Sequence, residues 1–206
     1  MRIAILGAEC TGKTRLAQAL VSALKPHHPH VSWVSEYLRA WCDAHGRTPR
    51  ADEQAHIAQV QMQRIQAAPA ADLVLCDTTP LMTALYSELL LGDPYLLAGA
   101  LQTQKAFGLT LVTGLDLPWV ADGIQRDGEA VRTRADQRLR TLLQQHGIAY
   151  SLVYGTGEAR TQCALQAIDY ALGTPSVDNT GANWKWNCEK CSDPACEHRL
   201  FRGLIP

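Results

Sequence analysis

The sequence predicts an α/β domain built around a five-stranded, mainly parallel sheet. Short runs of β-branched and apolar residues alternate with longer stretches of helical period, which is the pattern of strands joined by helices. Successive strand candidates begin roughly 30 to 40 residues apart, which leaves room for a helical crossover between parallel strands. The 206 residues are 47% hydrophobic and 19% charged, so the chain can bury a core and is not intrinsically disordered.

Each element follows from this alternation. We expect strands at residues 2–6, 31–35, 72–77, 109–113 and 149–154. Between and after them, apolar residues recur with helical period, and we expect helices at 13–24, 37–44, 51–67, 80–91, 94–106, 128–146 and 158–172. The sequence from residue 174 onward has turn-forming residues and no helical period. We therefore predict a first domain over residues 1–173 and a separate tail over residues 174–206.

Charge and hydropathy limit the partners of the protein. The 19 basic and 20 acidic residues nearly cancel, and no run of Lys or Arg is present, so a nucleic-acid surface is not expected. No apolar stretch approaches the roughly 20 residues that a membrane helix needs, and the apolar run at the N-terminus is too short for the hydrophobic region of a secretory signal. We expect a cytoplasmic protein that binds small molecules and no membrane.

A phosphate-binding loop joins the first predicted strand to the first predicted helix. Residues 7–14 read GAECTGKT and match the pattern G-x-x-x-x-G-K-[ST], whose backbone N–H groups and lysine bind nucleotide phosphates. In this role Lys13 contacts the β- and γ-phosphates and Thr14 binds Mg²⁺. The alternative is a glycine-rich turn that only packs strand on helix. We predict that ATP is bound by Gly7, Glu9, Cys10, Thr11, Gly12, Lys13 and Thr14.

Two carboxylates follow other predicted strands. Asp77 ends an apolar strand and is the candidate for the second magnesium-binding side chain, because ligands bind at the carboxyl ends of parallel strands. Its alternative role is a helix N-cap. Glu36 follows the second strand and is a candidate to accept a proton from an attacking hydroxyl, or else it is a surface glutamate at a helix start. Arg39 is a candidate to hold substrate or phosphate.

An arginine-rich stretch lies near the end of the first domain. Residues 123–140 contain five arginines against three acidic residues. Arg126 lies between two glycines and is the candidate for a catalytic lid arginine that closes over ATP. We expect the later arginines to form a solvent-exposed helix face, with pairs four residues apart such as Arg132 and Asp136.

Together these motifs resemble the NadR-like P-loop kinases, the ribosylnicotinamide kinase domain of bifunctional NAD-biosynthesis regulators and their relatives. The resemblance covers about residues 1–172. It rests on segments 7–14, 36–39 and 116–123, and on Asp77-Thr78 followed by Thr83 and Tyr86-Ser87-Glu88. The resemblance implies a P-loop NTPase fold with an adenylate-kinase-like sheet. It further implies ATP and Mg²⁺ as the phosphoryl donor, and a nucleoside-like hydroxyl, such as that of nicotinamide riboside, as the acceptor.

The resemblance also suggests where an acceptor binds. Glu36 and Asp77 become its acceptor-side and magnesium-side carboxylates, and the substrate residues that it implies are Glu36, Tyr37, Arg39, Trp119 and Asp122. Tyr37, Trp41, Tyr86 and Trp119 are candidates to stack on an aromatic ring, with core packing as the alternative.

The chain departs from the family pattern at two places. Gln125 lies before Arg126 where the family has the arginine one position earlier. Because the chain begins at the first predicted strand, we do not carry over the DNA-binding or nucleotidylyltransferase activities.

The tail contains a second candidate site. Three cysteines and one histidine lie within eleven residues, and such a set forms a closed, tetrahedral structural zinc site. Unliganded thiols, an iron–sulfur cluster and a redox pair are the alternatives. A zinc-bound tail would offer a surface for a second copy of the chain or a protein partner. It therefore supports an alternative function, an ATP-binding or ATP-hydrolysing regulatory protein. The predicted zinc ligands are Cys188, Cys191, Cys196 and His198.

Overall fold

The computed structural model describes residues 1–69, 71–120 and 128–173. Over these residues the five predicted strands and seven predicted helices are all present, five of them with the predicted bounds. In chain order they are β1 (Arg2–Leu6), α1 (Lys13–Leu24), β2 (Val31–Val34), α2 (Tyr37–His45), α3 (Ala51–Ala67), β3 (Leu73–Asp77), α4 (Pro80–Leu91), α5 (Leu97–Gln104), β4 (Leu109–Thr113), α6 (Glu129–Gln145), β5 (Ser151–Val153) and α7 (Gly157–Leu172).

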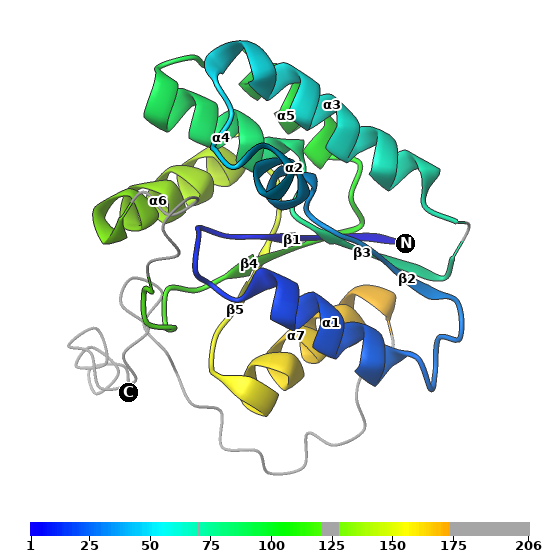
Figure 1. Ribbon diagram of the computed structural model, residues 1–206. Helices are drawn as coiled ribbons and strands as arrows, with labels where there is room; N and C mark the ends of the chain where they lie inside the picture. The colour runs from blue at the N-terminus through cyan, green and yellow to red at the C-terminus, as the bar shows by residue number, and fades with distance from the viewer. Residues whose placement is uncertain (70, 121–127, 174–206) are drawn as a thin grey trace, which may run out of the picture.

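The strands form one sheet in the order β2-β3-β1-β4-β5, and every neighbouring pair is parallel. In the register, Ile5 lies beside Asp77, and Val34 lies beside Cys76. The carboxyl ends of β1, β2 and β3 therefore meet at one edge of the sheet (Figure 1). This edge brings the phosphate loop together with the segments that contain Glu36 and Asp77.

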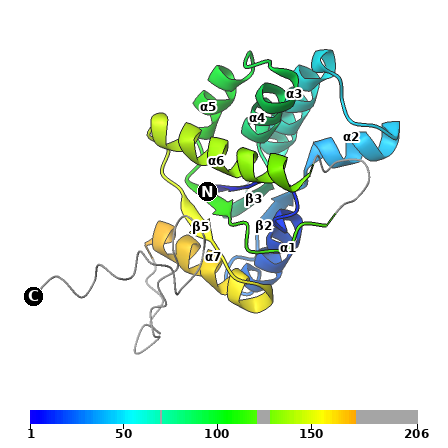
Figure 2. The same ribbon diagram turned by 90° about the vertical axis from the view of Figure 1, so that its left-hand side faces the viewer.

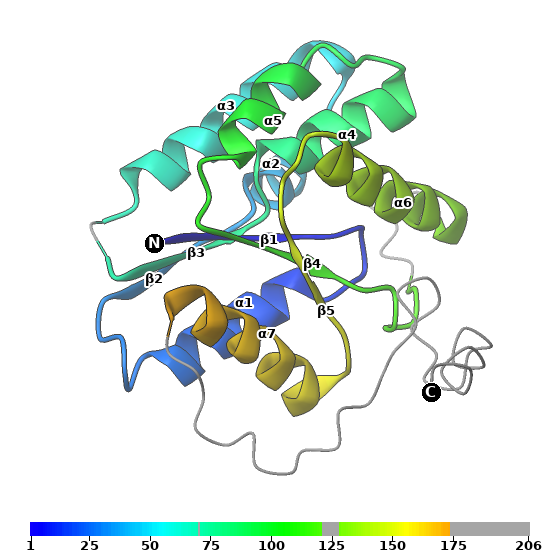
Figure 3. The same cartoon turned by 180° about the vertical axis from the view of Figure 1, so that it is seen from behind.

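Helices cover both faces of the sheet, as Figures 1 and 3 show from opposite sides. Side chains of a strand point alternately to the two faces, and residues 3–6 of β1 are completely buried. Ile3 and Ile5 pack in the cluster that includes α1 and α7, whereas Ala4 and Leu6 pack in the cluster that includes α4, α5 and α6. This α/β/α arrangement (Figure 2) leaves the carboxyl edge of the sheet for ligands.

The start of α4 decides one of the alternatives for Asp77. Thr79 is the N-cap of this helix, and its Oγ1 accepts a hydrogen bond from the backbone N–H of Leu81 at 3.3 Å. Pro80 occupies the first turn, where proline is favoured. Asp77 lies within β3, two residues before the N-cap, so it does not cap the helix.

The predicted solvent-exposed pairing on α6 is wrong. Arg132 is only 3% exposed and donates hydrogen bonds to the backbone oxygens of Leu115 and Leu117 at 2.9 and 2.6 Å. Asp136 is also buried and pairs with Arg140 at 2.9 Å. Spacing along the helix indicated a surface pair, but the loop after β4 packs over this side of α6 and captures the guanidinium group of Arg132.

Several predictions lie outside the described residues. These are the substrate residue Asp122, the lid residue Arg126 and the four zinc ligands Cys188, Cys191, Cys196 and His198. Among the residues that the structure does describe, no helix has both the length and the apolar character needed to cross a membrane.

Candidate active site

The phosphate loop runs from β1 to α1, and its two glycines have backbone conformations that favour glycine. Gly7 has φ of 146° and Gly12 has φ of 74°. A side chain at position 7 would also collide with the side chain of Thr113. A hydrogen bond within the loop stabilises it: the hydroxyl of Thr11 donates to the carbonyl oxygen of Ala8 at 2.7 Å. The glycine pattern found in the sequence is therefore required by the geometry.

Lys13 folds back over this loop. Its Nζ donates hydrogen bonds of 3.0 Å to the carbonyl oxygens of Gly7 and Ala8. An ammonium group has three donors, so one remains to bind an anion at the mouth of the loop. The first N–H groups of α1 point the same way and add the partial positive charge of a helix N-terminus. The loop and Lys13 together can hold the phosphates of a nucleotide.

Thr14 and Asp77 meet at the carboxyl edge of the sheet, although 63 residues separate them. The hydroxyl of Thr14 donates to Oδ2 of Asp77 at 2.6 Å. The carboxyl group is 1% exposed, and its Oδ1 has no hydrogen-bond partner among the described residues. Burial raises the pKa of Asp77, and the negative charge of Glu36 raises it further, while the Thr14 hydrogen bond lowers it.

A hydroxyl and a carboxylate with an unpartnered oxygen suit Mg²⁺. This ion prefers oxygen ligands and is usually bound by one or two protein groups together with substrate phosphates. Thr14 and Asp77 would hold this ion beside the loop. Its positive charge would offset the free-energy cost of keeping the buried carboxylate of Asp77 ionised.

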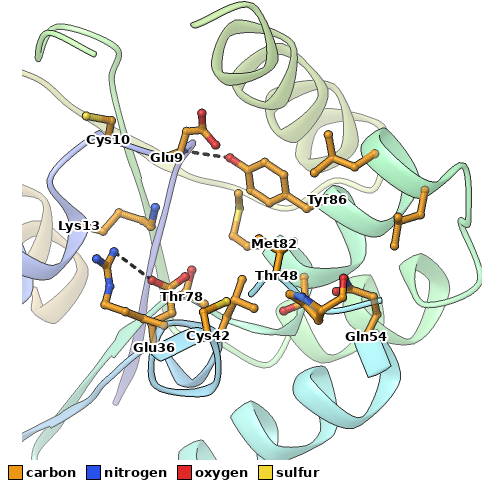
Figure 4. A pocket seen from close by; sticks show the side chains of 16 residues that line it. Glu9, Cys10, Lys13, Glu36, Cys42, Thr48, Gln54, Thr78, Met82 and Tyr86 are labelled. Carbon is orange, nitrogen blue, oxygen red and sulfur yellow. Dashed lines mark hydrogen bonds and ion pairs between the residues drawn. The ribbon is translucent and has the colours of Figure 1, made fainter. Parts of the chain in front are cut away.

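Glu36 is the N-cap residue of α2, but its side chain makes no capping hydrogen bond. The side chain is 15% exposed and forms an ion pair of 3.5 Å with Arg39 (Figure 4). Glu36 and Lys13 line the same cavity. Glu36 is therefore not the surface glutamate of the alternative interpretation. Its carboxylate lies where a substrate in the cavity can contact it.

The cavity has a volume of about 400 Å³, within the range of small-molecule sites. Its charged end adjoins the phosphate loop and its other end is mostly uncharged (Figure 4). The charged end is formed by Glu9, Lys13, Glu36 and Arg39. The remaining lining residues are Cys10, Leu38, Cys42, Thr48, Pro49, Gln54, Thr78, Met82, Thr83, Tyr86, Leu90 and Leu91.

Of the four aromatic candidates, Tyr86 alone is among the residues that line this cavity. Its hydroxyl oxygen accepts a hydrogen bond from the backbone N–H of Glu9 at 3.0 Å, as Figure 4 marks. Tyr37 packs against α3, with the guanidinium group of Arg64 4.5 Å from its ring. Trp41 is buried and stacks on a histidine of its own helix. Trp119 donates its indole N–H to Glu9 at 3.3 Å.

Most of the uncharged end of the cavity was not found from the sequence, although Thr78, Thr83 and Tyr86 belong to the motifs that support the resemblance. Thr48 and Pro49 lie in the loop between α2 and α3, which is held by two hydrogen bonds of 2.7 Å from Arg47 to Glu53. These bonds lower the pKa of Glu53 to about 2. No sequence signal marked Thr48, Pro49 or Gln54 as part of this wall, since it forms only after the helices pack.

The comparisons with known proteins agree with this architecture. A family model described as an AAA domain matches residues 2–160. The chain belongs to this family. No curated protein matches the chain in sequence.

Solved structures show the same fold at low sequence identity. The NadR protein in complex with NR has a TM-score of 0.71 and 19% identity, over 88% of this chain and 54% of that chain. NadR with NAD and AMP-PNP has a TM-score of 0.66 and 20% identity, over 84% and 49%. Deoxyadenosine kinase from M. mycoides has a TM-score of 0.55 and 15% identity, over 84% and 100%. The AAA-domain chain thus has the α/β fold of P-loop kinases, and it spans about half the length of the NadR chains that it matches.

Proposed function

We propose that this AAA-domain protein is an ATP- and Mg²⁺-dependent kinase that transfers the γ-phosphoryl group to a nucleoside-like hydroxyl. One observation carries the proposal. The 400 Å³ cavity opens directly onto the phosphate loop, and Lys13 and Glu36 both line it. A protein that only hydrolyses ATP needs no cavity of this size beside its phosphate loop, whereas a kinase must hold an acceptor in line with the γ-phosphate.

The chemistry assigned to each residue follows from its position. The acceptor oxygen bonds to the γ-phosphorus, the bond from that phosphorus to the bridging oxygen breaks, and ADP leaves with the electron pair. Glu36 accepts the hydroxyl proton, because its carboxylate lies at the charged end of the cavity. Lys13 neutralises the phosphate oxygens. Thr14 and Asp77 would hold Mg²⁺, whose charge would further neutralise the transferring group.

Nicotinamide riboside is the first acceptor to test. The NadR structure that this fold resembles is a complex with NR, and the uncharged end of the cavity, with Gln54 and Tyr86, suits an aromatic ring bearing an amide. Arg39, beside Glu36, is proposed to hold the acceptor. Asp122 and Arg126 keep their predicted roles in substrate binding and in the lid. Tyr37 and Trp119 lie outside the cavity lining, so they are not assigned acceptor contacts.

The test measures ADP release with and without a panel of nucleosides. We expect an acceptor to stimulate turnover, and Glu36→Gln to lower the stimulated rate about a hundredfold, because a general base contributes about 10²- to 10⁴-fold. Glu158→Gln, on an exposed glutamate at the start of α7, serves as the matched control. If no acceptor stimulates turnover and Glu36→Gln leaves hydrolysis unchanged, the kinase hypothesis is wrong and the regulatory ATPase is favoured.

We also propose that residues 174–206 form a zinc-bound unit separate from the kinase domain of residues 1–173. Support comes from the sequence alone, in which Cys188, Cys191, Cys196 and His198 have the composition of a closed structural site. Zinc binding would supply the folding free energy that so short a segment lacks. The unit would then be available to bind a second copy of the chain or another protein.

Metal analysis of the purified protein should find about one zinc per chain, since four ligands close one tetrahedral site. Cys191→Ser should lose most of that zinc, while Cys163→Ser, on α7 in the first domain, should retain it. Iron in place of zinc, or no metal in the wild-type protein, would refute the assignment.

A further inference from the structure

Gln61 of α3 is a buried polar side chain that does not line the cavity. It is 1% exposed, and its side-chain amide makes three hydrogen bonds to backbone groups of other segments. Its Oε1 accepts from the N–H of Tyr37 at 2.7 Å, and its Nε2 donates to the carbonyl oxygens of Ser35 at 3.4 Å and Thr78 at 3.5 Å. These bonds use both donors of the amide.

Two of these bonds enclose Glu36. Ser35 precedes it and Tyr37 follows it, so one amide group holds the backbone on both sides of the proposed base. An N-cap side chain ordinarily bonds to N–H groups of its own helix, but the Glu36 side chain makes no such bond. Gln61 instead satisfies the first N–H of α2, and the carboxylate of Glu36 lies on the cavity.

The third bond reaches the segment after β3. Thr78 directly follows Asp77 and has φ of 75°, a conformation that a β-branched residue rarely adopts. Its N–H donates to the carbonyl oxygen of Ile5 at 3.1 Å, and its carbonyl oxygen accepts from Gln61. The side chain of Gln61 therefore connects the segment containing Glu36 to the segment containing Asp77. Gln61 and Thr78 are 17 residues apart in the sequence.

We propose that Gln61 is a positioning residue for Glu36, setting the backbone on either side of the carboxylate relative to the Asp77 segment. This inference rests on the proposed kinase function. Glu36 would direct its carboxylate at the acceptor hydroxyl only while both flanking peptide groups are held. Substitution of Gln61 would lower the rate of phosphoryl transfer and leave ATP binding to the phosphate loop intact, since no bond of Gln61 reaches residues 7–14.

The test is a double-mutant cycle with kinetics and amide hydrogen exchange. Gln61→Leu should lower the acceptor-dependent kcat at least about tenfold, since small displacements of a catalytic group have large effects on rate, with the KM for ATP unchanged within about twofold. In a Glu36→Gln background the same substitution should cost less than about threefold, because the group that it positions is already inactive. Gln61→Glu keeps the acceptor for Tyr37 N–H and serves if the leucine variant does not fold.

Gln104→Leu is the matched control. Gln104 is also 1% exposed, and its side chain hydrogen-bonds to Thr79 and Thr110 and to no group beside Glu36, so its substitution should cost stability without the kcat effect. Equal losses in both backgrounds would overturn the proposal.

Amide exchange separates this proposal from the kinase assignment, because it needs no acceptor. Exchange at Tyr37 should accelerate at least about tenfold in Gln61→Leu and stay unchanged in Gln104→Leu. Unchanged exchange at Tyr37 in Gln61→Leu would refute the positioning role even in a protein that proves to be a kinase. Failure of every acceptor to stimulate turnover, with faster Tyr37 exchange, would refute the kinase function alone.

Discussion

Lys13→Ala is expected to lower ATP-dependent turnover by up to about a hundredfold and to weaken ATP binding. A hydrogen bond from a charged donor contributes about 1.5–3 kcal/mol, and the upper value corresponds to about a hundredfold in rate. In the structure Lys13 already bonds to the carbonyl oxygens of Gly7 and Ala8, so its ammonium group is held at the mouth of the loop before a nucleotide arrives. ATP titration and steady-state ADP release would measure the two effects.

Arg15→Ala provides the control for that experiment. Arg15 lies two residues further along α1, carries the same charge and is exposed. Its removal should change turnover less than about twofold. Retained ATP affinity and turnover in Lys13→Ala would refute the assignment of residues 7–14 as the phosphate site.

Asp77→Asn is expected to have opposite effects on activity and on stability. Turnover should fall at least about a hundredfold, because the metal ion contributes several kcal/mol of charge stabilisation in phosphoryl transfer. The nucleotide-free variant should nevertheless be at least as stable as the wild-type protein at neutral pH. The amide oxygen can still accept the Thr14 hydrogen bond, while the cost of a buried carboxylate charge is removed.

The sign of the pH dependence follows from the raised pKa of Asp77. The folded protein holds this proton more tightly than the unfolded chain, so the contribution of Asp77 to stability falls as pH rises from its ordinary pKa of 3.8 through the raised value. The asparagine variant lacks this loss. Thermal unfolding between pH 4 and 8 should therefore show its advantage over the wild type increasing with pH.

Magnesium and ATP should reverse the order of stability. A ligand that binds only the folded protein raises the unfolding temperature, and we expect a much smaller rise for Asp77→Asn than for the wild type. Asp72→Asn, on an exposed residue just before the same strand, should show neither effect. A variant that keeps its turnover, or that is destabilised more at pH 8 than at pH 4, would contradict the proposed role of Asp77.

The phosphate loop could be predicted from the sequence because every part of it is local. The glycines, Lys13 and Thr14 lie within eight consecutive residues, and the strand before them and the helix after them are set by hydropathy period. The meeting of Thr14 and Asp77 was also predictable, since the carboxyl ends of parallel strands share one edge.

Residues whose environment depends on packing between distant elements could not be predicted. The spacing of Arg132 and Asp136 along α6 indicated a surface pair, yet both are buried, and Arg132 bonds to the loop after β4 instead. Likewise, Gln61 resembles any polar residue of an amphipathic helix, and nothing near it in sequence shows that its amide contacts the segments after β2 and β3.

The sequence by itself determined the α/β class, the order and type of the elements and the phosphate loop, because these depend on residues a few positions apart. The tertiary structure alone decided the strand order β2-β3-β1-β4-β5 and the cavity beside Lys13 and Glu36. It also decided which of the candidate aromatic rings faces that cavity. The physical reason is that the free energy of these arrangements comes from apolar faces and buried hydrogen bonds shared between distant elements, and a linear pattern does not specify which faces meet.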